Sequence, residues 1–169
     1  MDYWMLVLRL VHIFAGVFWV GTTLTTGLYL RPATQAAGEG GRQVMHQLIT
    51  KARLATAMTT AAILTVLAGY AMYWLDSDGF TSAWTHSGPG TGFAIGGGAG
   101  LLGLITRILA NRNMGALNRL ASGSDESSTK EESQKLNSLQ KTQALLYTLN
   151  TWLLIIAVLF MATARYLVF

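Results

Sequence analysis

The first long apolar segment of the chain, residues 4–30, contains a histidine and an arginine one helical turn apart, His12 and Arg9. Ionisable side chains are costly to place in a lipid bilayer, and they mark functional sites there by default. A neutral imidazole is a good ligand for haem iron and for other transition metals. The first chemistry to consider is therefore metal or haem binding by His12.

Depth along a helix brings further groups to the same level. His12 lies about 13 Å inside one end of its segment at helical rise, and Met161 reaches a similar depth in the last apolar segment. Arg165 follows one turn outward of Met161, at about the level of Arg9. Since a guanidinium binds both oxygens of a carboxylate, this set predicts haem b, with His12 on the iron and Arg9 and Arg165 on the propionates.

Each of these residues also has a purely structural interpretation. Arginines near span ends extend their charged groups to the lipid headgroups, and a single histidine can hydrogen-bond a neighbouring helix. Methionine packs adaptably in apolar interiors, so Met161 also fits as core filler. For the second iron ligand the sequence leaves three options open, namely His86 in the loop 76–90, Met161 and none. We expect His46 to be a surface residue.

Polar and small residues follow two helical stripes. The first segment places one stripe towards the protein interior: Met5, Arg9, His12, Gly16, Trp19, Thr23 and Gly27. The third apolar segment has a second: Gly92, Gly96, Gly100, Gly103 and Arg107. Glycines at this spacing let helices approach closely; alternatively, Gly16, Gly96 and Gly100 leave room for a flat cofactor. Both interpretations remain open.

Composition identifies the class of protein. Only 12% of the 169 residues are charged and 51% are hydrophobic, whereas soluble domains carry about 25% charged residues. Four segments are long and apolar enough to cross a bilayer, at about 4–30, 52–75, 92–111 and 144–167. The prediction is an all-α, integral membrane four-helix bundle that forms a single domain over 1–169.

Charge predicts the direction of the bundle. Of the twelve Lys and Arg residues, all but Arg9 and Arg165 lie in or beside the connection between the first two spans and the loop 112–143. Basic loops stay in the cytoplasm, so we expect an N-out, C-out protein of a bacterial plasma membrane. This topology accounts for the net charge of +4, and nucleic acid is not an expected partner.

The loop 112–143 holds helical signals at both of its ends. RNMGALNRLA (112–121) can extend the third span, and Thr129 with Glu132 fits a capping box from which a helix can run into the fourth. The intervening polar residues suit a solvated connector, or a regulatory segment.

Several chemistries are excluded or disfavoured by what the chain lacks. It has no cysteine, which excludes disulfides, thiolate metal sites and c-type haem attachment. No Asp or Glu lies inside a span, which disfavours a carboxylate proton relay. GFAIGGGAG opens a membrane span and does not follow a soluble strand, so it does not match a dinucleotide fingerprint.

Two stretches carry a family resemblance. LRLVHIFAGVFWVG (8–21) and MATARYL (161–167) resemble the first and last helices of the CopD-like and HemJ-like membrane proteins. The resemblance implies a haem b or copper-associated bundle with His12 as a ligand. The HemJ-like oxidases carry a lysine in a later helix, whereas no Lys lies between 52 and 129 here, which disfavours porphyrinogen oxidation. The Met and His residues are not clustered, which disfavours copper handling. Haem-based electron transfer therefore ranks first.

Three functional hypotheses follow. The first is a cytochrome b-like protein that exchanges electrons with a quinone or a periplasmic partner, or a small oxidoreductase, with a homodimer formed through a glycine-lined face. The second is copper transport or homeostasis. The third is a cofactor-free accessory subunit of a larger membrane complex.

Overall fold

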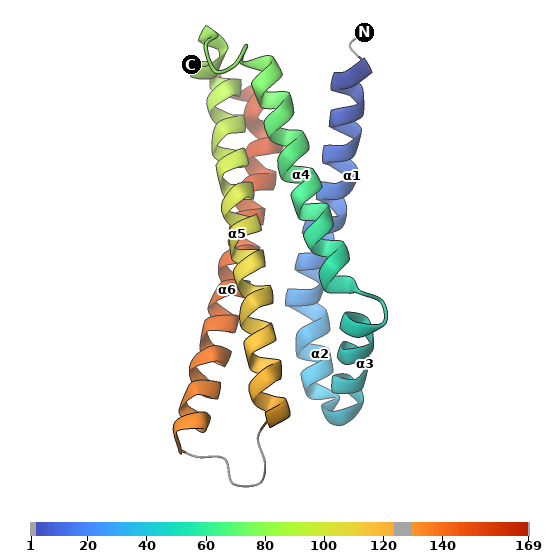
Figure 1. Cartoon of the computed structure of the whole chain (residues 1–169). Coiled ribbons are helices and arrows are strands. Elements are labelled where there is room, and N and C mark those ends of the chain that lie inside the picture. The colour runs from blue at the N-terminus through green and yellow to red at the C-terminus, as the bar shows by residue number, and fades with distance from the viewer. Residues whose placement is uncertain (1–2, 124–129, 169) are drawn as a thin grey trace.

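A computed structural model describes residues 3–123 and 130–168. Its elements are helices α1 (Tyr3–Thr25), η1 (Thr26–Leu30), α2 (Arg31–Ala36), α3 (Gly38–Thr50), α4 (Leu54–Asp76), η2 (Ala83–His86), α5 (Gly88–Gly123), α6 (Lys130–Thr163) and η3 (Ala164–Tyr166). The described residues contain no strand. Four helical stretches are long and apolar enough to cross a membrane, which confirms the all-α four-helix bundle (Figure 1).

The bundle consists of two helix pairs, α1 with α4 and α5 with α6, and α4 also contacts α5 of the second pair. Helix α1 packs along α4, and α5 packs along α6 over most of their lengths. Helix α4 runs diagonally, from beside α3 to the start of α5 (Figure 1). Both chain ends lie at one end of the bundle, here called the termini end; α2 and α3 lie at the other, here called the α3 end.

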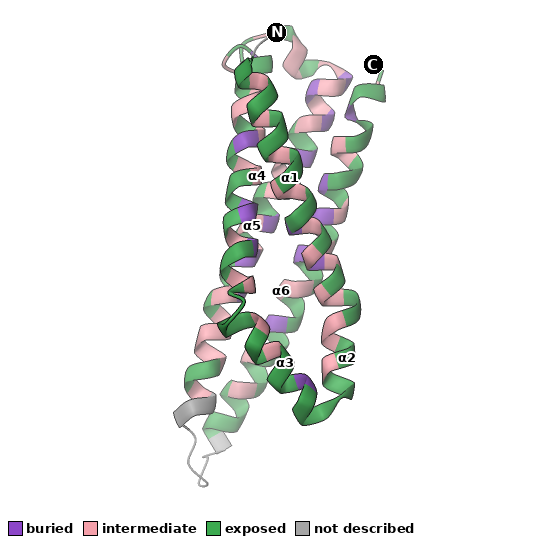
Figure 2. Ribbon diagram, turned by 90° about the vertical axis from the view of Figure 1, so that its right-hand side faces the viewer, coloured by how far each residue is buried: buried purple, intermediate pink, exposed green. Residues whose placement is uncertain are grey.

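The core of the bundle is small, and the outer surface of the bundle is apolar. Trp19, Ala61, Ala62 and Leu154 form the central cluster, in which Trp19 is only 1% exposed. Alanines and glycines line the helix contacts, and large apolar side chains such as Phe14, at 73% exposed, face outward. Exposed residues follow every long helix of the bundle (Figure 2). Small residues inside and large apolar residues outside are typical of a bundle solvated by lipid.

The first helix continues beyond its predicted end at residue 30. Helical backbone extends through a π-helical turn, η1, into α2. The Arg31 amide donates to the Thr26 carbonyl, five residues back, and Pro32 follows directly. Proline has no amide hydrogen and cannot make the usual helical bond. The wider turn therefore lies where the regular hydrogen-bond pattern would break.

The connection between the first two spans contains a helix, α3, that the sequence analysis did not predict. Gly38 adopts a left-handed φ of 60° between α2 and α3. A Cβ on Gly41 would clash with the backbone of Thr34. Glycine is required where two helices fold back this closely, so α3 depends on residues that lower its helix propensity.

Both predicted helical extensions of the 112–143 loop are confirmed. Helix α5 continues to Gly123, and α6 begins at Lys130 and runs into the last span. Glu131 and Glu132 lie in its first turn, where negative charge is favoured by the helix dipole. The proposed capping residue, Thr129, lies outside the described residues.

Candidate functional site

His12 lies half-buried between α1 and α4. Its Nδ1 atom is 2.8 Å from the Thr65 carbonyl oxygen, and its ring covers Gly69. A Cβ added at Gly69 would lie 2.8 Å from Cε1 and 2.9 Å from Nδ1 of this ring. The missing side chain at Gly69 is therefore what lets the imidazole lie against the backbone of α4.

This contact determines which ring nitrogen is free. A carbonyl oxygen only accepts hydrogen bonds, so Nδ1 carries the proton and donates it to Thr65. The lone pair then belongs to Nε2, which is the nitrogen able to bind a metal. Metal-binding histidines commonly donate their other N–H to a carbonyl in this way.

Most of the predicted α1 stripe does face the protein interior. Gly16 lies in ordinary contact with Thr65, and Gly27 lies close to Thr151 of α6. Trp19 and Thr23 are buried, and neither the Trp19 Nε1 nor the Thr23 Oγ1 has a hydrogen-bond partner. Trp19 lies close to Gly103 of α5 and Leu154 of α6.

Arg9 departs from the stripe prediction. Arg9 is exposed, although the helical wheel places it on the interior face of α1. The reason is the tilt of α1: it meets α6 at the cluster that contains Trp19 and Leu154, and the two helices separate towards the termini end (Figures 1 and 2). Arg9 lies outward of this contact and is exposed, whereas Met5, one turn further outward, is partly buried.

Three of the five stripe residues on α5 are glycines that accommodate close contacts. Gly92 lies against Ala164, Gly96 against Met161 and Gly103 against Leu154, each within 3.4 Å of an added Cβ. These contacts support the close-packing interpretation at those positions. By contrast, a Cβ at Gly100 would meet nothing within 4 Å.

The other predicted ligands lie on different parts of the bundle. Met161 packs against Gly96 at the α5–α6 contact, whereas His12 contacts α4. Arg165 is exposed in η3, which packs on α5. His86 is exposed in η2, at the termini end. The described contacts do not bring His12 together with Met161, Arg165 or His86.

His46 is exposed in α3, as the sequence analysis expected of a surface residue. Within the ranges that the structure describes, no three His, Asp or Glu side chains form a group able to hold a metal ion.

A second polar cluster lies nearer the α3 end, around Arg107, which the sequence placed on the stripe of the third apolar segment. Arg107 of α5 is only 6% exposed. Its Nη2 atom is 3.4 Å from the Ala55 carbonyl oxygen and 3.5 Å from the Met58 sulfur, while its Nε has no partner. The contact with the carbonyl oxygen is long for a hydrogen bond, and a buried cation is unusual in an apolar bundle.

Side-chain amides of Asn150, which is buried, and Asn111, which is partly buried, connect the helices around this arginine. The Asn150 side chain of α6 donates to the Gly103 carbonyl at 2.6 Å and to the Thr106 hydroxyl at 2.9 Å. Asn111 donates to the Thr59 hydroxyl of α4 at 2.9 Å. Such bonds hold membrane helices together. Asn150 was visible in the sequence as a polar residue inside an apolar span.

Comparisons with known proteins give no relative. Neither the family models, nor the curated proteins, nor the solved structures include a match to this chain.

Proposed function

We propose that this chain is a membrane haem b protein that transfers electrons, with the iron bound by Nε2 of His12. One observation carries the proposal: the hydrogen bond from Nδ1 to the Thr65 carbonyl orients the ring and leaves Nε2 with its lone pair. The close contact with Gly69 restricts the ring further. An imidazole whose orientation is already restricted loses little conformational entropy when it binds the iron.

The residues around His12 fit part of what haem b requires. The Thr65 carbonyl would increase the basicity of the imidazole by accepting its other proton. Arg9, one turn outward on the same helix, is exposed and free to reach a propionate; we propose the same role for Arg165. Haem iron would supply one-electron chemistry, and a quinone or a periplasmic protein would be the redox partner.

The second iron ligand and the oligomer belong to the same proposal. His86 is exposed and thus available as a ligand, whereas Met161 is engaged with Gly96. Gly97, Gly98 and Gly100 leave open space beside α5, which suits a second copy of the chain packing there. We place the α3 end in the cytoplasm of a bacterial cell, following the positive charges.

The test is a reduced-minus-oxidised absorption spectrum of the full chain purified in mild detergent. We expect Soret and α bands for the wild type, and their loss in the His12→Ala variant. The matched control is His46→Ala, which removes an exposed imidazole and should leave the bands unchanged. If the purified wild type has no bands, or if His12→Ala keeps them, the proposal is wrong.

Metal analysis of the same sample separates the alternatives. Copper without iron would favour copper transport or homeostasis. Co-purified proteins without either metal would favour an accessory subunit.

A further inference from the structure

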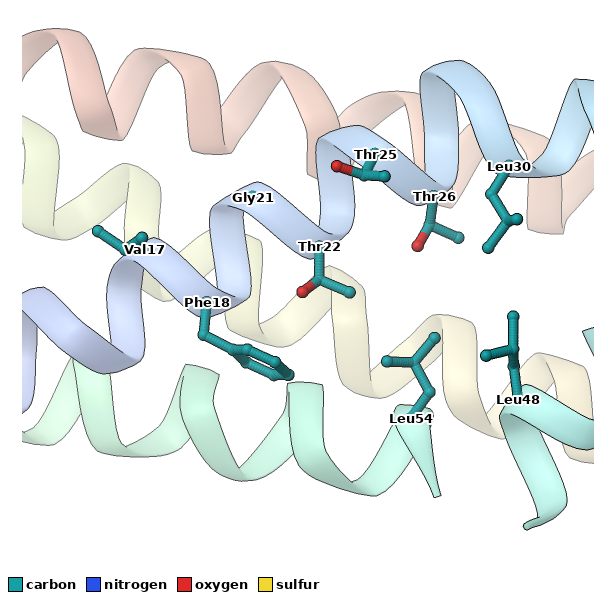
Figure 3. Close-up of a pocket in the computed structure, with 9 residues that line it drawn as sticks. All are labelled: Val17, Phe18, Gly21, Thr22, Thr25, Thr26, Leu30, Leu48 and Leu54. Atoms are coloured by element: carbon teal, nitrogen blue, oxygen red, sulfur yellow. The ribbon is translucent and has the colours of Figure 1, made fainter. Parts of the chain in front are cut away.

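The α3 end of the bundle contains two adjoining cavities that share Thr26. The first is a groove of about 360 Å³ between α1, α3 and α4 (Figure 3). Its lining is mainly apolar, with Val17 and Phe18 at one end and Leu48 and Leu54 near the other. The groove therefore suits a hydrocarbon chain.

The second cavity, of about 450 Å³, is basic. Arg31 and Arg42 line it, and the described residues of its lining include no carboxylate. The Arg31 guanidinium lies 4.1 Å from the centre of the Tyr147 ring, which also lines the cavity. Arg42 makes an exposed ion pair with Glu39 at 3.7 Å, which is worth little in water.

A third positive charge interacts with a residue of this lining. The buried Arg107 interacts with the Tyr147 hydroxyl, and Arg31 lies over the ring of the same tyrosine. The two guanidiniums therefore share one neighbour, and Arg107 Nε has no hydrogen-bond partner. The net charge in and beside the cavity is positive, which favours an anion as its occupant.

We propose that the two cavities together bind one anionic phospholipid. Its phosphate would occupy the basic cavity beside Arg31, and an acyl chain would lie in the apolar groove past Thr26. Arginine binds phosphate oxygens in pairs, and basic pockets between membrane helices recognise anionic headgroups. The residue that both cavities share, Thr26, lies in the π-helical turn η1. This site is independent of His12.

Binding is measured by titrating phosphatidylglycerol into the full chain in detergent and counting bound lipids by native mass spectrometry. We expect Arg31→Gln to weaken binding about fivefold, since a basic side chain contributes about 1 kcal/mol to attraction of an anionic lipid. The matched control is Arg112→Gln, at an exposed position of α5 outside the cavity lining. This control should bind as the wild type does.

A second variant fills the apolar groove. Gly21 lines it, and a Cβ there would meet nothing within 4 Å, so Gly21→Leu adds side-chain volume at the groove from an unobstructed Cβ. We expect weaker phosphatidylglycerol binding in this variant, even if Arg31→Gln were to fail to fold.

Two further ligands distinguish the source of the phosphate. Phosphatidylcholine should bind more weakly than phosphatidylglycerol, and inorganic phosphate should compete poorly. Equal binding of both lipids would overturn the proposal, as would equal effects of the Arg31 and Arg112 substitutions. Full competition by inorganic phosphate would show instead a site for a free anion.

Discussion

The contact between Gly69 and His12 makes a quantitative prediction. In a Gly69→Ala variant, the new methyl group would lie 2.8 Å from Cε1 and 2.9 Å from Nδ1 of His12. Carbon atoms in contact prefer about 3.5–4.0 Å, so the ring must move by roughly 0.7 Å or more. Because Nδ1 is already at 2.8 Å from the Thr65 oxygen, this displacement also strains the hydrogen bond.

The loss of stability in Gly69→Ala is best measured by comparison with an alanine substitution at a second helical glycine, Gly100. Overpacking costs about 1–3 kcal/mol, while replacing a helical glycine by alanine returns about 0.5–1 kcal/mol through the backbone. Gly100→Ala receives only that gain, because nothing lies within 4 Å of its Cβ. We therefore expect Gly69→Ala to be less stable than Gly100→Ala by about 1–3 kcal/mol.

The assay is reversible unfolding in mixed micelles, with the free energy of unfolding measured for each variant. A double-mutant cycle with His12→Ala isolates the contact: without the imidazole, the Gly69→Ala substitution should cost little. Equal stabilities of the two alanine variants, or an unchanged penalty in the His12→Ala background, would show that the ring does not lie against Gly69.

Two other substitutions test the interior of the bundle in the same assay. Asn150→Leu removes the hydrogen bonds to Gly103 and Thr106 and should cost about 1 kcal/mol; no loss would mean that these bonds do not link α5 to α6. Trp19→Ala empties the central cluster and should cost about 3–5 kcal/mol, whereas Trp152→Ala, at a residue 60% exposed, should cost far less; similar values would contradict the placement of Trp19 in the core.

Hydropathy was enough to predict the four spans, because a bilayer restricts spanning segments to long apolar helices. It could not predict the ends of the first helix. Hydropathy ended the first span at about residue 30, yet the π-helical turn carries helical backbone on through Arg31 and Pro32. Helix α3 was missed because Gly38 and Gly41 lower its propensity while meeting the steric needs of the fold.

The candidate site was predictable only on each helix separately. Periodicity placed His12, Trp19 and Thr23 on one face, and all three do meet other helices. Helical rise placed Arg9 and Arg165 at one depth, but it carries no information about the tilt that separates α1 from α6. The partner of His12 on α4, and the approach of Arg107 to Tyr147, depend on packing between helices that one sequence does not specify.

The number of haems bound per chain tests the central proposal most directly. Purified wild-type protein, supplied with haem and freed of excess, should retain haem in a fixed ratio to the chain. His12→Ala should retain almost none, while His46→Ala should match the wild type. Equal haem content in the wild type and His12→Ala, or no retained haem in either, would contradict the role given to the Nε2 atom of His12.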